Sequence, residues 1–152
     1  MTRIEGGIVI GRPIDEVFDV VADARSEPRY NPRMVRVELL SDEPVGLGAR
    51  FRAQLRSSRG RVVPMTIEWV AVERPRRLGA VTRSAAFEAS GELRLEFVED
   101  GTLLRWSWDV RPQGAMRRLA PVAGVLGGWR ERRLRVSLKR LLEAGGGAPG
   151  RT

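Results

Sequence analysis

Apolar and polar residues alternate along most of the chain between Met34 and Val110. Residues 50–56, 92–97 and 104–110 show this most clearly, with an apolar side chain at every second position. Such alternation is typical of antiparallel strands that have one covered face and one solvated face. We therefore expect seven strands, at residues 3–11, 35–39, 50–56, 62–73, 78–83, 87–98 and 104–110. The strand at 78–83 is expected to be short and irregular, and Glu99-Asp100-Gly101 to form a hairpin turn.

Only two segments have the composition to cover one face of that sheet. Residues 13–32 start with Pro13, Asp15 and Glu16, which suit the first turn of a helix. A second short helix near 26–30 is expected to end before Pro32. Residues 114–143 form the other segment, and their later half repeats leucine at helical spacing. The expected fold class is α+β, with an antiparallel sheet, two short N-terminal helices and a long C-terminal helix.

The two halves of this C-terminal helix differ in composition. Small residues dominate the half before Trp129: Ala115, Ala120, Ala123, Gly124, Gly127 and Gly128. A buried helix normally carries bulky side chains that fill the core. We therefore expect the first half of the helix to close a cavity. Pro121 lacks a backbone N–H, which predicts a break near Ala120.

The absence of histidine and cysteine restricts the available chemistry. It excludes imidazole bases, thiol nucleophiles, disulfides and metal sites built from these residues. Catalysis would have to use carboxylates, arginine, tyrosine, serine, threonine or water. The sequence has no metal-ligand spacing, phosphate loop or dinucleotide fingerprint, so we expect no metal and no cofactor.

The length of 152 residues suits one domain, which we expect at 1–144, followed by a disordered glycine-rich tail at 145–152. No signal peptide is recognisable. The longest apolar run, residues 119–129, is well short of the roughly 20 residues that span a bilayer, so a cytoplasmic location is expected. The net charge of +8 comes almost wholly from scattered arginines, with Lys139 as the only lysine. Aromatic residues do not interleave with the arginine clusters, so nucleic acid is not the expected partner.

Five segments carry a family resemblance: PIDEVFDVVADARSEPRYNP at 13–32, VGLGARF at 45–51, VERPRRL at 72–78, LEFVEDGTLLRWSWDV at 95–110 and WRERRLRVSLKRLLE at 129–143. Together they resemble the polyketide cyclase/dehydrase branch of the START-like (SRPBCC) superfamily, over about residues 3–144. The resemblance implies the Bet v 1-like helix-grip fold, in which a seven-stranded antiparallel sheet grips the C-terminal helix around an apolar cavity. Relatives include aromatase/cyclases, lipid carriers, coenzyme Q binders and plant hormone receptors, and the fold alone does not select among them.

Three polar residues are candidates for catalysis in such a cavity. Glu68 would act as an acid or base if it faced the interior, where burial raises the pKa of a carboxyl. The opposite strand orientation puts Trp69 inside and Glu68 in water, and the sequence does not decide between the two. Tyr30 either places its hydroxyl at the cavity mouth or wedges its ring beneath a loop. Arg130 either orients a ligand carboxylate or enolate, or extends to solvent.

The residues predicted to line the cavity are Phe51, Leu93, Leu95, Trp106, Trp108, Leu119, Ala123, Leu126 and Gly127. For Trp106 and Trp108 ordinary core packing is the alternative. The expected function is to bind or carry a small apolar molecule of lipid, quinone or polyketide type. The alternative is a cyclase or aromatase that uses Glu68, Tyr30 and Arg130. An outward-facing Trp69 would suggest a contact between two copies, which makes a homodimer a possible assembly.

Overall fold

A single antiparallel sheet with the strand order β1-β7-β6-β5-β4-β3-β2 forms the body of the protein. The computed structural model describes residues 2–57 and 59–146. The strands are β1 (Thr2–Ile10), β2 (Met34–Leu39), β3 (Arg50–Arg56), β4 (Val62–Glu73), β5 (Arg77–Ser84), β6 (Phe87–Val98) and β7 (Gly101–Pro112). β1 and β2 are neighbours in sequence but form the two opposite edges of the sheet. The seven-stranded antiparallel sheet and the helix-grip architecture are therefore confirmed.

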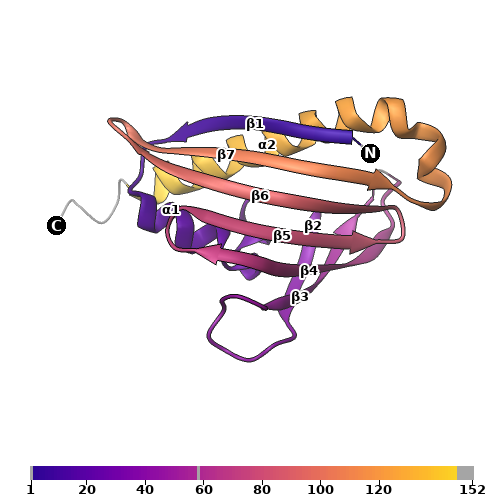
Figure 1. Ribbon diagram of the computed structural model, residues 1–152, viewed down its shortest axis with the longest axis horizontal. Helices are drawn as coiled ribbons and strands as arrows, with labels where there is room; N and C mark the ends of the chain where they lie inside the picture. The colour runs from indigo at the N-terminus through magenta and orange to yellow at the C-terminus, as the bar shows by residue number, and fades with distance from the viewer. Residues whose placement is uncertain (1, 58, 147–152) are drawn as a thin grey trace.

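Two sets of helices lie on one side of the sheet. The helix α1 (Ile14–Val21) and the 3-10 helix η1 (Ala24–Arg29) connect the two edge strands. After β7 the chain forms a 3-10 helix, η2 (Gly114–Leu119), and then the long helix α2 (Ala120–Gly146), which runs behind the sheet along β1 and β7 (Figure 1). The change from 3-10 to α geometry falls at Ala120, where the sequence predicted a break. Pro121 thus occupies the first turn of α2, where its missing N–H costs no hydrogen bond.

One end of the interior is densely packed. Val17, Phe18 and Val21 of α1 are buried there, and Leu138 of α2 is fully buried. They share one cluster with Leu95, Leu104, Leu78 and Phe51, each at most 1% exposed. The spacing of the α1 residues puts them on one helical face, which explains why this short helix is held by tertiary packing.

A β-bulge in β4 decides which residues face the interior. Trp69 pairs with Ala80 and Ala71 pairs with Gly79, so the register shifts between them. Trp69 is 6% exposed and Val72 packs against the core, whereas Val70 is 48% exposed. Without the bulge Trp69 and Val72 would point to opposite faces, because they are three residues apart. Sequence alternation alone therefore left the orientation of this strand open.

Two boundaries differ from those expected from the sequence. β5 is a regular eight-residue strand that pairs with both β4 and β6, so the prediction of a short, irregular segment was wrong. Helix α2 continues to Gly146, which places Gly145 and Gly146 in the helix and not in a tail. The remaining part of the predicted tail, residues 147–152, lies outside the described residues.

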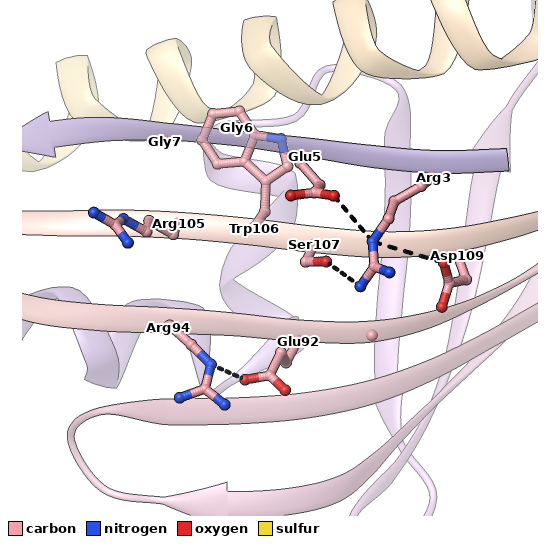
Figure 2. A pocket seen from close by; sticks show the side chains of 11 residues that line it. Arg3, Glu5, Gly6, Gly7, Glu92, Arg94, Arg105, Trp106, Ser107 and Asp109 are labelled. Carbon is pink, nitrogen blue, oxygen red and sulfur yellow. Dashed lines mark hydrogen bonds and ion pairs between the residues drawn. The ribbon is translucent and has the colours of Figure 1, made fainter.

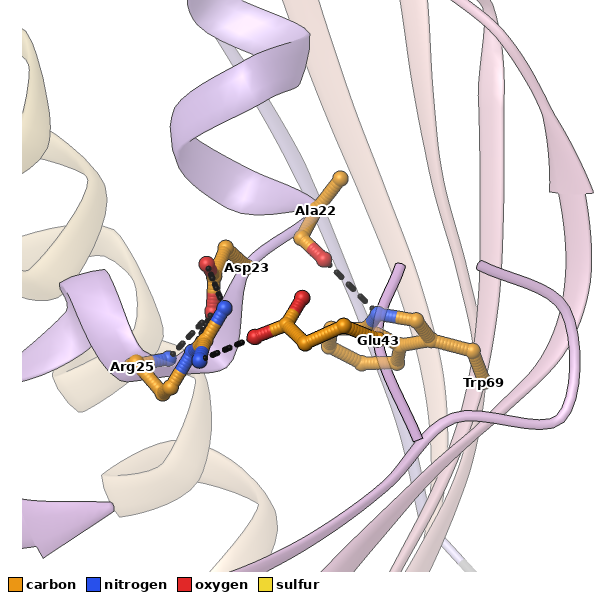
Figure 3. A network of polar contacts seen from close by, with 5 residues as sticks. All are labelled: Ala22, Asp23, Arg25, Glu43 and Trp69. Atoms are coloured by element: carbon orange, nitrogen blue, oxygen red, sulfur yellow. Dashed lines mark hydrogen bonds and ion pairs between the residues drawn. The ribbon is translucent and has the colours of Figure 1, made fainter. Parts of the chain in front are cut away.

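Trp69 also joins the helical corner to the sheet. Its indole Nε1–H donates a hydrogen bond of 2.7 Å to the carbonyl of Ala22, as Figure 3 shows. Beside it, Asp23 caps η1 by accepting from the backbone N–H of Arg25, whose guanidinium also binds Glu43 in the β2–β3 loop. The hydrogen bonds from Arg25 hold the pKa of the Asp23 carboxyl below its ordinary value. This network fixes α1, η1 and the β2–β3 loop against β4.

We expect Trp69→Phe to lower the free energy of unfolding by about 1–3 kcal/mol, because a partly buried carbonyl loses its donor. Urea denaturation monitored by circular dichroism measures the change. Trp129→Phe is the matched control, since Trp129 is 59% exposed, and its effect should lie within about 0.5 kcal/mol. Equal losses for the two variants would contradict the structural role of the Trp69 hydrogen bond.

Candidate functional site

The inner face of the sheet is only partly covered at the end where β7 leads into η2. Strand pairing places six half-buried residues on this face: Thr82, Ser84, Phe87, Ala89, Trp108 and Val110. We call this set the inner patch. It lies at the far end of β5, β6 and β7 from α1, which is the right-hand end in Figure 1. The inner patch combines an aromatic and aliphatic surface with two hydroxyl groups.

Four of the five predicted lining residues on the sheet lie in the filled part of the same face. Phe51, Leu93, Leu95 and Trp106 are at most 4% exposed and belong to the core cluster. Trp108 differs, because it is only partly buried and belongs to the inner patch. The predicted lining is thus divided between a packed half and a partly exposed half of one sheet face.

The predicted lining residues of α2 occupy different surroundings. Gly127 lies against β1, where an added Cβ would be 2.7 Å from Cδ1 of Ile4. It is therefore a contact between helix and strand, and its missing side chain lets the two approach. Leu126 is 47% exposed, so it is not enclosed beneath the helix. The side chains of Leu119 and Ala123 lie outside the described part of the chain.

A buried polar cluster lies between η1 and α2, and we call it the polar cluster. Its members are Glu27, Tyr30, Asn31, Glu131 and Arg135. Arg135 is 7% exposed and its Nε–H donates to Oε1 of Glu131 at 2.7 Å. Asn31 donates from Nδ2 to Oε1 of Glu27 at 2.9 Å. Tyr30 is 4% exposed and interacts electrostatically with Glu27, Glu131 and Arg135.

Five polar atoms of the cluster have no hydrogen-bond partner among the described residues: the Tyr30 hydroxyl, the two Nη atoms of Arg135, and one carboxylate oxygen each of Glu27 and Glu131. Within the same described residues, no fully buried side-chain nitrogen or oxygen lacks a partner. These five atoms therefore retain accessible surface, although Tyr30 and Arg135 are almost completely buried. Such atoms are available to a ligand.

Burial changes the acidity of the cluster. Loss of solvation raises the pKa of the Glu27 carboxyl, and the interactions with Asn31 and Arg135 oppose this change only in part. Burial, assisted by the charge of Glu27, also raises the pKa of the Tyr30 hydroxyl. Burial disfavours the charge of Arg135, but Glu131, Tyr30 and Glu27 outweigh it and raise the pKa of its guanidinium. Tyr30 is consequently a neutral donor and Arg135 a cation at neutral pH.

The three residues predicted from the sequence to be catalytic do not lie together. Tyr30 belongs to the polar cluster. Arg130 is exposed on α2. Burial of Arg33 lowers the pKa of the Arg33 guanidinium, and the charge of Arg130 lowers it further. Glu68 lies on the outer face of β4, opposite to Ile67 and Trp69, so the structure selects the second of the two strand orientations, which places Trp69 inside. The bulge that turns both Trp69 and Val72 inward is the physical reason.

The outer face of the sheet also carries a cavity, of about 720 Å³, across β1, β7 and β6. Its lining includes Gly6 and Gly7, which Figure 2 labels, and Gly91. Two of its arginines bind acidic neighbours: Arg3 contacts Glu5 at 3.0 Å, and Arg94 contacts Glu92 at 2.5 Å. This open, mutually neutralised surface offers less to a ligand than the polar cluster and the inner patch.

Neither a metal cluster nor a membrane-spanning helix is found among the described residues. No group of three or more acidic side chains is arranged so that it could hold a metal ion. Within those same residues, no helix combines the length and apolar character needed to cross a bilayer.

Comparison with known families gives a match over residues 1–144 to the family described as polyketide cyclase / dehydrase and lipid transport. The chain belongs to this family. The resemblance inferred from the sequence is therefore confirmed. Comparison with curated protein sequences found no significant match.

Several solved structures share the fold of this polyketide cyclase/dehydrase and lipid transport family member. A START superfamily protein from Mycobacterium smegmatis is 15% identical, with a TM-score of 0.81, over 95% of this chain and 99% of its own. The Zhui aromatase/cyclase from Streptomyces sp. R1128 is 19% identical, with a TM-score of 0.69, over 91% and 94%. The di-domain ARO/CYC StfQ from the steffimycin biosynthetic pathway is 12% identical, with a TM-score of 0.75, over 97% of this chain and 52% of its own. At these identities the likeness concerns the fold.

Sequence reasoning missed Glu27, Glu131 and Arg135. A signal for two of them is present, because Glu131 and Arg135 are four residues apart and Arg135 adjoins the leucine stripe that contains Leu134 and Leu138. The same spacing occurs at Lys139 and Glu143, whose side chains are about a third exposed. Spacing alone does not distinguish the buried pair from the exposed one.

We expect Glu27→Gln to raise the melting temperature at pH 7 by a few degrees, because the amide keeps an acceptor for Asn31 without a buried charge. The pKa of the Glu27 carboxyl is higher in the folded state than in the unfolded state. Glu27 therefore stabilises the fold fully only below its unfolded pKa, near 4.3. This contribution is lost as the pH rises through the folded pKa. The gain of the variant should therefore shrink towards pH 4. Scanning fluorimetry between pH 4 and 8 measures it.

Glu99→Gln is the control for this measurement, because Glu99 lies in the exposed β6–β7 turn. Its melting temperature should follow that of the wild type at every pH. A loss of stability for Glu27→Gln at pH 7 would contradict the expectation and show that Arg135 requires the charge of Glu27.

Proposed function

We propose that the protein binds a small apolar molecule against the inner patch, between the sheet and the first half of α2. The observation that carries this proposal is the partial exposure of Phe87, Trp108 and Val110 on a sheet face that is otherwise closed. Inward-facing apolar side chains that are left half-covered by their own chain favour an apolar ligand, because its binding removes their surface from water. The family description, which includes lipid transport, supports the same interpretation.

The composition of the inner patch suits a ligand that is partly aromatic or polyketide-like. Trp108 and Phe87 offer ring surfaces, and Thr82 and Ser84 offer hydroxyl groups at the β5 end of the patch. Ser84 already binds the backbone N–H groups of Ala86 and Phe87 through its hydroxyl. Thr82 is thus the hydroxyl of the patch that is more available to a ligand.

A cyclase or aromatase activity in the same interior is the second candidate. The observation that favours it is the Tyr30 hydroxyl beside Glu27, since a buried acid with a raised pKa can take part in proton transfer. Two of the structures that share the fold are named aromatase/cyclases. Glu68 has no part in this version, because it lies on the outer face. Turnover of a poly-β-ketone by the wild type, lost in Tyr30→Phe while binding persists, would support it; unchanged turnover would remove Tyr30 from the mechanism.

For the binding function we expect Ala89→Leu to weaken the affinity for the neutral fluorescent probe Nile red by about tenfold. The added side chain fills space over the inner patch, and overpacking of this size costs roughly 1–3 kcal/mol. Fluorescence titration measures the dissociation constant, and circular dichroism checks the fold.

Ser90→Leu is the matched control, because Ser90 is the next residue on β6 and pairs with Val81 and Asp109 on the outer face. It should leave the affinity unchanged. Equal weakening by both variants, or an absence of probe binding by the wild type, would overturn the proposed site.

A further inference from the structure

Arg135 places a charged group between α2 and the η1 segment. Its side chain is 8% exposed, and its one carboxylate contact among the described residues joins Nε to Oε1 of Glu131 at 2.7 Å. Removing a guanidinium from water is costly unless its donors are satisfied. The two Nη groups nevertheless have no acceptor among the described residues. They form a planar pair of donors of the kind that binds a carboxylate or a similar oxygen anion through two parallel bonds.

Tyr30 supplies a further donor at the same place. Its ring is buried and its hydroxyl has no partner among the described residues, while Arg135 and Glu131 are close enough to affect it electrostatically. The remaining charges around the hydroxyl come from Glu27, within η1, and from Arg29. Asn31 donates to one oxygen of Glu27 and Arg135 donates to one oxygen of Glu131, so each carboxylate already has one donor.

The polar cluster lies further along α2 than the contact of that helix with β1. Ile4, which pairs with Trp108 of the patch, contacts α2 at Gly127. Arg135 follows eight residues later, which is about 12 Å along the helix axis. Beyond it, Leu138 belongs to the fully packed end. A ligand that rests on the inner patch would thus have to extend about 12 Å along α2 to reach Arg135.

We propose that Arg135 and Tyr30 bind an anionic oxygen group at the inner end of the ligand, so that the ligand is an apolar molecule that ends in a carboxylate or an enolate. This inference rests on the proposed binding function and names the class of ligand. The guanidinium supplies the opposite charge, and the Tyr30 hydroxyl supplies a neutral donor. The apolar part of the ligand lies on the inner patch.

Decanoate and decanol test the proposal, because they share a chain and differ in the charged oxygen group. Their affinities are measured at pH 7.5 by displacement of Nile red. We expect the wild type to bind decanoate about tenfold more tightly than decanol, as one charge-assisted contact would provide. Tyr30→Phe should reduce this preference several-fold.

The decisive variant is the double substitution Glu131→Gln with Arg135→Met. It removes one charge of each sign, so the net charge of the protein and its long-range attraction for anions stay the same. The preference for decanoate should fall to about one. Lys139→Met with Glu143→Gln is the matched control: this pair has the same spacing on the same helix, and its side chains are 35% and 37% exposed. The control should keep the preference.

The outcomes separate this inference from the proposed function. Equal affinity of the wild type for both molecules, or a preference that survives the Glu131/Arg135 substitution, would overturn the anion site and leave the binding function standing. A change only in melting temperature would do the same, because it assigns Arg135 to stability. Failure of the wild type to bind Nile red or either molecule would overturn both.

Discussion

The structure depends on the burial of one face of a seven-stranded sheet by two helical segments. The helices α1 and η1 connect the edge strands and close one end of that face, and Leu138 of α2 completes this packed end. The rest of α2 runs along β1 and approaches it closely at Gly127. Such limited cover leaves apolar residues of β6 and β7 partly exposed at the other end. The site is therefore a consequence of how the interior is covered.

The helix that provides this cover also carries a buried charge. Arg135 lies two turns beyond the contact with Ile4, and it is stabilised by Glu131 from the preceding turn of the helix. A buried ion pair is seldom the most stable solution, because apolar residues of similar size avoid the cost of desolvation. Its presence beside Tyr30 and Glu27 is the observation from which the proposed anion site is argued.

The two faces of the sheet use arginine in different ways. On the outer face Arg3, Arg94 and Arg77 pair with acidic neighbours on the same or the adjacent strand, at the surface. Such exposed pairs contribute little to stability, and they leave few free donors. Arg135 has the opposite properties: it is buried, and two of its nitrogens are free among the described residues. A high arginine content alone does not separate these roles.

Local pattern determined most of the fold. The strands, the hairpin and the last helix were predictable from the sequence, because they depend only on local periodicity and turn chemistry. The patterns that predict them are the alternation of residues 50–56 and 92–97, the turn at Glu99-Asp100-Gly101 and the leucine spacing after Trp129.

The side on which Glu68 and Trp69 lie was not predictable, because it depends on one bulge, and a bulge is set by packing against the neighbouring strand. The polar cluster joins residues 27–31 with residues 131–135, about a hundred positions apart, and the sequence contains no local signal for that pairing. The sequence thus determined the sheet, its covering helices and the absence of thiol and imidazole chemistry. Only the tertiary structure decided which polar residues are buried, because burial depends on which surfaces meet across the fold.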